Sequence, residues 1–144
     1  MIVHAGLIAR RLQGRWLGVL IEGPSGSGKS DLALRALAQG WRLVADDRTL
    51  LWVSEGRLFG RAPDALLGLL EARGLGILGL DPLRLCEVGL AARPGTPDRL
   101  PDTQARDFLG VTTPVVEMSP LDASTPAKLV RALERVDAGR HRRM

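Results

Sequence analysis

The sequence predicts a single α/β domain with a mixed β-sheet and a phosphate-binding loop. Its 144 residues are 45% hydrophobic, and this length and composition suit one core rather than two. Residues 23–30, GPSGSGKS, match the motif G-x-x-x-x-G-K-[ST] in full. Apolar segments of strand length surround one helical pattern, and a hairpin pattern follows. This order predicts a mixed sheet.

The chain before the motif predicts a β-hairpin. Residues 2–9 and 16–22 are apolar, and Gln13-Gly14-Arg15 between them suits a turn because glycine accepts a positive φ. His4 lies on the first of these strands. A single histidine there has a structural role by default, unless a partner side chain is found.

The motif itself lies between a strand pattern and a helix pattern. Residues 17–21 are a short apolar run, and residues 32–38 follow a helical period that ends at Gly40. This context predicts a P-loop rather than a chance glycine-serine turn, since backbone N–H groups at a helix start bind phosphate. In such loops the lysine contacts the β- and γ-phosphates and the serine hydroxyl binds Mg²⁺. The predicted nucleotide-binding residues are Gly23, Pro24, Ser25, Gly26, Ser27, Gly28, Lys29 and Ser30.

Two adjacent aspartates follow the next predicted strand. Residues 41–45 are short and apolar, and they end at Asp46 and Asp47. Ligands in open α/β sheets bind at the carboxyl ends of strands, so both acids can meet a nucleotide on the P-loop. One carboxylate can hold Mg²⁺ and the other can take a proton from an attacking hydroxyl. An Asx turn that closes the strand is the structural alternative.

The middle of the chain predicts a second hairpin and a glycine-rich segment. Residues 49–53 and 57–59 flank a turn at 54–56, and residues 61–70 suit a short turn or helix. Residues 71–80 then hold three glycines and two opposite charges. Glu71 is a candidate metal ligand and Arg73 a candidate phosphate contact. From residue type alone, two solvent-exposed charged side chains beside a strand are an equally good interpretation.

The last third predicts two strands, a long loop and a helix. Residues 83–90 suit a strand with Cys86 in the core, and residues 91–106 suit a polar loop that can carry Arg99 toward a transferring phosphate. Residues 114–118 suit a final strand. Residues 126–136 suit an amphipathic helix capped by Ser124 or Thr125, and a flexible basic tail is predicted from about residue 138 to 144.

Composition narrows the classes of function and location. The net charge is +4, but aromatic residues make up only 3% of the chain, which argues against base stacking with single-stranded nucleic acid. No apolar stretch approaches the length of a membrane span, and no signal peptide pattern is present. A single cysteine fits a reducing compartment. These features predict a cytoplasmic protein that binds neither nucleic acid nor membranes.

Taken together, the motifs resemble the catalytic, C-terminal domain of HPr kinase/phosphorylase, a bacterial enzyme that acts on a serine of the phosphocarrier protein HPr. The resemblance covers nearly the whole chain and rests on His4 and on residues 23–31, 43–48, 70–77 and 98–100, in this order. It implies the fold shared by HPr kinases and PEP carboxykinases. It also implies ATP and Mg²⁺ as cofactors, an HPr-type partner and a homo-oligomer, a hexamer.

The resemblance also implies roles for particular residues. Asp47 is the expected base that deprotonates the target serine, and Lys29 is expected to neutralise phosphate. The implied catalytic residues are His4, Lys29, Asp47 and Arg99. The implied metal ligands are Ser30, Asp46 and Glu71. The implied catalytic and partner-binding segment contains Glu71, Arg73, Gly74 and Gly76.

Two departures from the family pattern limit what the resemblance implies. The chain is similar to a short form without the N-terminal domain of longer relatives. Residues 116–124 differ from the Pro-Val-x-x-Gly-Arg type loop that those relatives use in dephosphorylation, so the resemblance supports the kinase direction more than reverse phosphorolysis. Two alternatives stay open: a P-loop kinase for a small molecule, and a non-catalytic nucleotide-dependent switch that binds an HPr-like partner.

Overall fold

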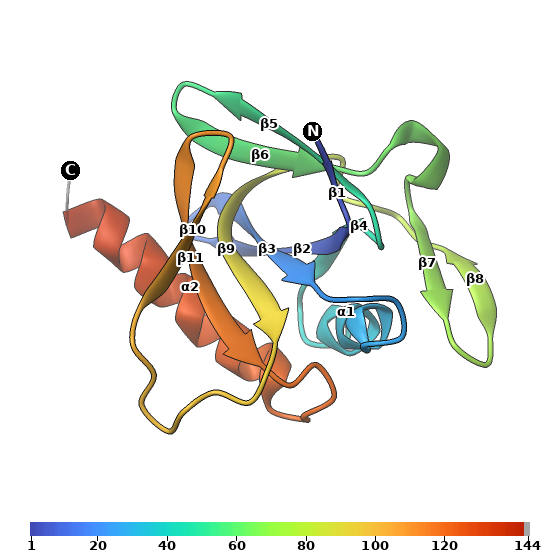
Figure 1. Cartoon of the computed structure of the whole chain (residues 1–144). Coiled ribbons are helices and arrows are strands. Elements are labelled where there is room, and N and C mark those ends of the chain that lie inside the picture. The colour runs from blue at the N-terminus through green and yellow to red at the C-terminus, as the bar shows by residue number, and fades with distance from the viewer. Residues whose placement is uncertain (143–144) are drawn as a thin grey trace.

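The structure, a computed structural model, describes residues 1–142, with side chains through residue 139. These residues form a curled nine-stranded mixed sheet with two α-helices and a separate two-stranded hairpin (Figure 1). The predicted α/β fold with a mixed sheet is confirmed. Within residues 1–142, neither α-helix has the length and apolar character that crossing a bilayer requires.

The element bounds are as follows. The large sheet contains β1 (Ile2–Val3), β2 (Ala5–Leu12), β3 (Arg15–Glu22), β4 (Arg42–Ala45), β5 (Thr49–Ser54), β6 (Arg57–Arg61), β9 (Cys86–Pro94), β10 (Gln104–Phe108) and β11 (Val111–Met118). The small sheet contains β7 (Leu69–Ala72) and β8 (Gly76–Gly79). The helices are α1 (Lys29–Leu37), the 3-10 helix η1 (Asp64–Leu66) and α2 (Thr125–Arg142).

Four strands of the large sheet end at the same edge. β3 is parallel to β9, and β9 is parallel to β11. β4 pairs antiparallel with β2, which pairs antiparallel with β3, so β4 also runs parallel to β3. Across the sheet the order is β4-β2-β3-β9-β11, and the antiparallel strand β2 begins at this edge while the other four end there. The P-loop, the aspartate pair, and the loops 95–103 and 119–124 therefore all start from one edge.

Both faces of the central strands are buried. Val19 and Ile21 of β3 pack in the cluster that includes Leu32 of α1 and Leu129 of α2. Leu20, between them, packs in the opposite cluster, inside the curl of the sheet. Because successive side chains of a strand point to opposite faces, burial on both faces requires a continuous apolar run. This explains why apolar and polar residues do not alternate in the sequence of β3.

Three tight turns connect antiparallel strands. Residues 13–14, 55–56 and 109–110 have positive φ at both positions, as two-residue turns between twisted strands require. The first two hairpins were predicted from the sequence. The third, β10–β11, was not, because the exposed and charged residues of β10 resemble a loop.

Several predicted boundaries were wrong. Residues 2–9 are not one strand: the chain bends at His4, and β1 pairs with β5 while β2 pairs with β3. The strand predicted at 83–90 runs instead from Cys86 to Pro94, because parallel pairing with β3 and β11 buries residues 91–92. The predicted loop 91–106 is therefore shortened to 95–103.

The C-terminal helix is longer than predicted. α2 continues past residue 136 to Arg142, so residues 138–142 of the predicted basic tail are helical. Residues 143–144 of that tail lie outside the described residues.

A substitution inside the sheet tests the close packing of β3. A methyl group on Gly18 would lie 2.5 Å from Cys86 Sγ and 2.8 Å from Leu7 Cδ1, whereas a methyl group on Gly79 of β8 would meet nothing within 4 Å. We expect Gly18→Ala to lower the free energy of unfolding by about 1–3 kcal/mol through overpacking. Gly79→Ala is the matched control and leaves the urea midpoint nearly unchanged. Equal midpoints for the two variants would contradict this packing.

The cysteine gives a second test of the fold. Burial, reinforced by the negative charge of Glu87, raises the pKa of the Cys86 thiol far above its usual range. The thiol therefore stays protonated at pH 8, where an ordinary cysteine is partly thiolate. We expect no reaction with Ellman's reagent in the native protein and one reactive thiol per chain after unfolding in guanidinium. Rapid reaction of the native thiol would contradict the buried position on β9.

Candidate active site

A buried lysine lies at the centre of the site. Lys29 is the first residue of α1, and its side chain is only 5% exposed. Its ammonium donates a hydrogen bond to the Gly23 carbonyl, and it lies 3.4 Å from His4 Nε2 and 3.7 Å from Asp47 Oδ1. A buried cation needs such partners, because an unpaired charge away from water is costly. The contacts hold the side chain along the inside of the P-loop.

The predicted residues His4 and Asp47 meet directly. His4 Nε2 lies 2.7 Å from Asp47 Oδ1. The bend at His4 separates β1 from β2, and pairing of β1 with β5 places Val3 opposite Thr49, close to the aspartate pair. Asp47 has a φ of 66°, a left-handed conformation that aspartate adopts more readily than most residues. Both side chains are nearly half exposed, so an incoming group can reach the carboxylate.

The P-loop presents unpaired donors at the start of α1. Gly23, Gly26 and Gly28 have φ values of 141°, 83° and 100°, which other residues rarely adopt. In the described part of the chain, the backbone N–H groups of residues 29–31 have no hydrogen-bond partner. The Ser27 hydroxyl is buried and also lacks a partner there. Helix starts with free N–H groups bind anions, so this loop suits phosphate.

Two of the predicted metal ligands contact Asp46, Ser30 through its hydroxyl and Glu71 through its backbone N–H. The Ser30 hydroxyl donates to Asp46 Oδ1 at 2.7 Å, and the backbone N–H of Glu71 donates to Asp46 Oδ2 at 3.1 Å. Hairpin β7–β8 thus docks onto the end of β4 through Glu71. Over residues 1–142, no three His, Cys, Asp or Glu side chains form a ready-made metal cluster. The oxygen donors fit Mg²⁺, which binds through one or two carboxylates and takes its other ligands from phosphate and water.

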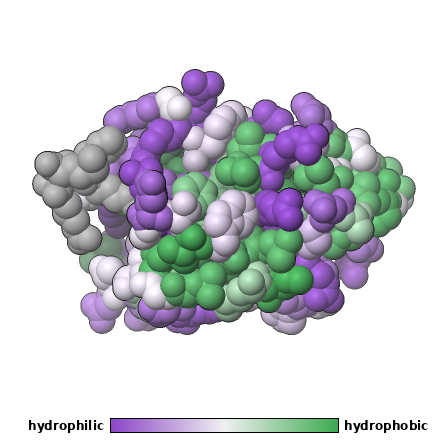
Figure 2. Space-filling view, turned by 90° about the horizontal axis from the view of Figure 1, so that it is seen from above, coloured by the Kyte–Doolittle hydropathy of each residue, from purple (hydrophilic) through white to green (hydrophobic). Residues whose placement is uncertain are grey.

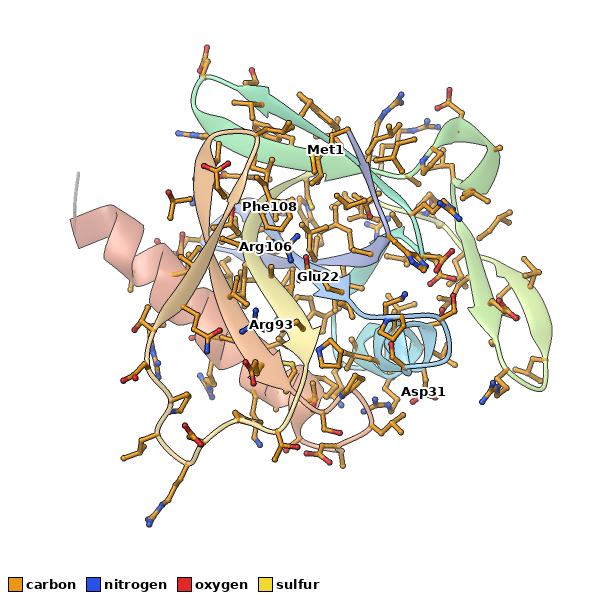
Figure 3. All side chains as sticks on the ribbon, viewed as in Figure 1. Met1, Glu22, Asp31, Arg93, Arg106 and Phe108 are labelled. Atoms are coloured by element: carbon orange, nitrogen blue, oxygen red, sulfur yellow. The ribbon has the colours of Figure 1, made fainter. Side chains whose placement is uncertain are left out.

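An ion pair that the sequence did not predict lies directly before the P-loop. Arg106 Nη1 of β10 lies 2.6 Å from Glu22 Oε1 at the end of β3, and its guanidinium stacks 4.5 Å from the Phe108 ring centre. Figure 3 shows Arg106 and Glu22 pointing toward one another. The Glu22 side chain is 15% exposed. A glutamate at the end of an apolar strand indicates that a cation lies nearby. The sequence did not identify that cation, because residue 106 was predicted to lie in a loop.

The other predicted arginines lie apart from this cluster. Arg99 is exposed on loop 95–103, which turns away from α1 at the lower left of Figure 1. Arg73, Gly74 and Gly76 lie at the exposed end of the β7–β8 hairpin. Within residues 1–142, neither Arg99 nor Arg73 forms a hydrogen bond or ion pair. Both side chains are therefore available to a bound phosphate or partner.

Comparisons with known proteins show which family the chain is similar to. Residues 5–83 match the family model described as the HPr Serine kinase C-terminal domain. HPr kinase/phosphorylase from Clostridium beijerinckii is 46% identical over 67 residues, which cover 46% of this chain and 22% of that protein. The enzyme of the same name from Streptococcus thermophilus is 52% identical over 63 residues, covering 43% of this chain and 20% of that protein. The matched segment thus spans about a fifth of these relatives.

A solved structure resembles the whole chain. The Hpr(Ser) kinase/phosphatase from Coxiella burnetii covers 99% of both chains with a TM-score of 0.76 and 26% sequence identity. The similarity therefore extends past residue 83 to β9, β10, β11 and α2.

Removal of the guanidinium beside the P-loop tests the Glu22–Arg106 pair. Arg106→Met keeps the aliphatic contact with Phe108 but leaves the mostly buried Glu22 carboxylate without its cation. We expect a loss of about 1 kcal/mol in the free energy of unfolding at pH 7, because Arg106 itself is half exposed. The double variant Glu22→Gln with Arg106→Met should recover most of that loss in urea unfolding. Additive losses from the two substitutions would show that the pair is not coupled.

Proposed function

The chain belongs to the family of the HPr serine kinase C-terminal domain, and on that premise we propose that it transfers a phosphoryl group from ATP to a serine of an HPr-type phosphocarrier protein. One observation carries the proposal: the Lys29 ammonium lies 3.7 Å from the Asp47 carboxylate beside the P-loop. A phosphate-binding cation and an accessible base are thus next to each other. Phosphoryl transfer needs little more than this positioning and electrostatic stabilisation.

Lys29 and the loop backbone bind the phosphates in this proposal. The free N–H groups of residues 29–31 and the Lys29 ammonium place donors and positive charge at the same loop. Charge that spreads over the transferring oxygens is stabilised there, in a site already organised before reaction. Arg99, on its exposed loop, supplies a further cation if the loop closes over the site.

Asp47 acts as the base. His4 donates its Nε2 hydrogen to the carboxylate and holds the carboxylate in place, while the second Asp47 oxygen accepts the serine hydroxyl proton. A carboxylate is a weak base, so the proton moves as the serine oxygen bonds to phosphorus and becomes acidic. In the reverse direction, inorganic phosphate attacks the seryl phosphate, pyrophosphate forms, and the protonated Asp47 returns its proton to the serine oxygen.

Ser30 and Asp46, with Glu71, would hold Mg²⁺ together with phosphate oxygens. When bound, the ion offsets the negative charge of the phosphates. The hydrogen bond between Ser30 and Asp46 orients both oxygens in its absence.

The surface near Asp47 supports a protein as the acceptor. Hairpin β7–β8 carries exposed apolar side chains at Leu69, Leu75 and Ile77, which are 38%, 77% and 64% exposed. Figure 2 shows an apolar end of the molecule on the side where this hairpin lies in Figure 1. Exposed apolar area of this kind suits contact with another protein. Assembly into a hexamer is a further prediction, which light scattering can test.

Phosphorylation of a purified HPr-type protein tests the proposal. We expect γ-labelled ATP and Mg²⁺ to give acid-stable label on a serine. Asp47→Asn, which suits the left-handed backbone but cannot accept the proton, should lower the rate by about 10²–10⁴-fold. Lys29→Ala should abolish labelling, and EDTA should do the same to the unmodified protein.

Matched controls separate chemistry from general damage. Asp64→Asn changes an aspartate that is 89% exposed, and Lys128→Ala changes an exposed lysine of α2. Both should retain full activity. ATP binding without any phosphoserine on the carrier would sink the kinase proposal and favour a nucleotide-dependent switch.

A further inference from the structure

The loop between β11 and α2, residues 119–124, holds an exposed leucine against the P-loop. A methyl group on Gly28 would lie 2.8 Å from Leu121 Cδ2 and 3.4 Å from Pro120 Cβ, so these side chains pack directly on the glycine. Pro120 is buried, but Leu121 is 67% exposed. Burial of the leucine side chain therefore stabilises the fold little, and the side chain presents an apolar surface beside the P-loop.

Arg35 holds the loop 119–124 in place by hydrogen bonds. The Arg35 guanidinium donates to the Pro120 carbonyl and, at 3.0 Å, to the Asp122 carbonyl, while its Nε donates to Asp31 at 2.9 Å. Thr125 adds a hydrogen bond from its hydroxyl to the Ser119 carbonyl at 2.6 Å. Because each carbonyl is held by a charged or buried donor, Leu121 keeps its position without a ligand.

The loop and Asp47 lie on opposite sides of the P-loop. At the shared sheet edge the order is β4-β2-β3-β9-β11, so Asp47 follows β4 on one side of β3 and loop 119–124 follows β11 on the other. In Figure 1, β1 and β2 meet above the end of α1, and the loop passes below it. The phosphate that is transferred must lie near Asp47 and Lys29. The rest of the donor then extends toward the other side of the P-loop, where Gly28, Asp31 and Leu121 lie.

We propose that Leu121 contacts the nucleoside of the phosphoryl donor and makes the site prefer a nucleoside triphosphate over inorganic triphosphate. The inference rests on the proposed function, since it assigns the far end of the donor in the same site. A base or ribose face placed on Leu121 removes apolar area from water. Arg35 is a positioning residue that acts through the loop.

Calorimetric titration with two probes tests this assignment. ATP and inorganic triphosphate, each with Mg²⁺, carry the same number of phosphorus atoms and differ in the nucleoside. The readout is the ratio of the triphosphate Kd to the ATP Kd. We expect Leu121→Ala to lower this ratio about fivefold by weakening ATP binding alone. Arg35→Gln, which releases the loop, should lower the ratio as well.

Leu85→Ala is the matched control. Leu85 is 48% exposed and precedes β9, at the opposite edge of the sheet from the P-loop. The substitution should leave the affinities for ATP and for inorganic triphosphate unchanged. Lys29→Ala should weaken both ligands and leave the ratio near its original value.

The outcomes separate the two proposals. If both ligands bind the unmodified protein and the ratio is unchanged in Leu121→Ala, the role of Leu121 is overturned and phosphate binding stands. A ratio that falls in Arg35→Gln but not in Leu121→Ala overturns it equally, because the loop position then matters without the leucine. If neither ligand binds, the proposed function fails, and the nucleoside contact fails with it.

Discussion

A buried ammonium group determines how the site is assembled. Lys29 lies under the P-loop with its side chain 5% exposed, and it needs acceptors that its own helix cannot supply. The Gly23 carbonyl and the Asp47 carboxylate meet this need, from just after β3 and just after β4. One charge thus contacts two segments that are separate in sequence. The same charge keeps the Asp47 carboxylate beside the P-loop.

The branching of the sheet at β9 gives the site its two sides. β6 pairs with the first residues of β9 and β11 pairs with the last ones, while β3 runs along the other edge. The P-loop therefore has β4 and its aspartates on one side and β11 with its loop on the other. The acceptor is proposed to approach from the first side and the nucleoside to occupy the second. Both depend on strands that end at one edge.

The elements of the chain differ in how much of their structure is visible in local sequence. The P-loop, the two early hairpins and both α-helices were predicted, because glycine positions, apolar runs and helical periods are local signals. β10 was missed, since its polar residues gain their strand conformation from pairing with β11. The bend at His4 was missed for a similar reason: β1 changes partner to β5, and no residue there breaks a strand.

The sequence by itself determined the chemistry that fits within a few consecutive residues. The loop 23–30 fixes Lys29 at a helix start, and the strand before Asp46 fixes both acids at a sheet edge. Only the tertiary structure decided which distant groups meet them. His4 and Asp47 are 43 positions apart, and Arg35 and Pro120 are 85 apart. Such contacts depend on strand order and register, which arise from packing of the whole sheet and not from any local pattern.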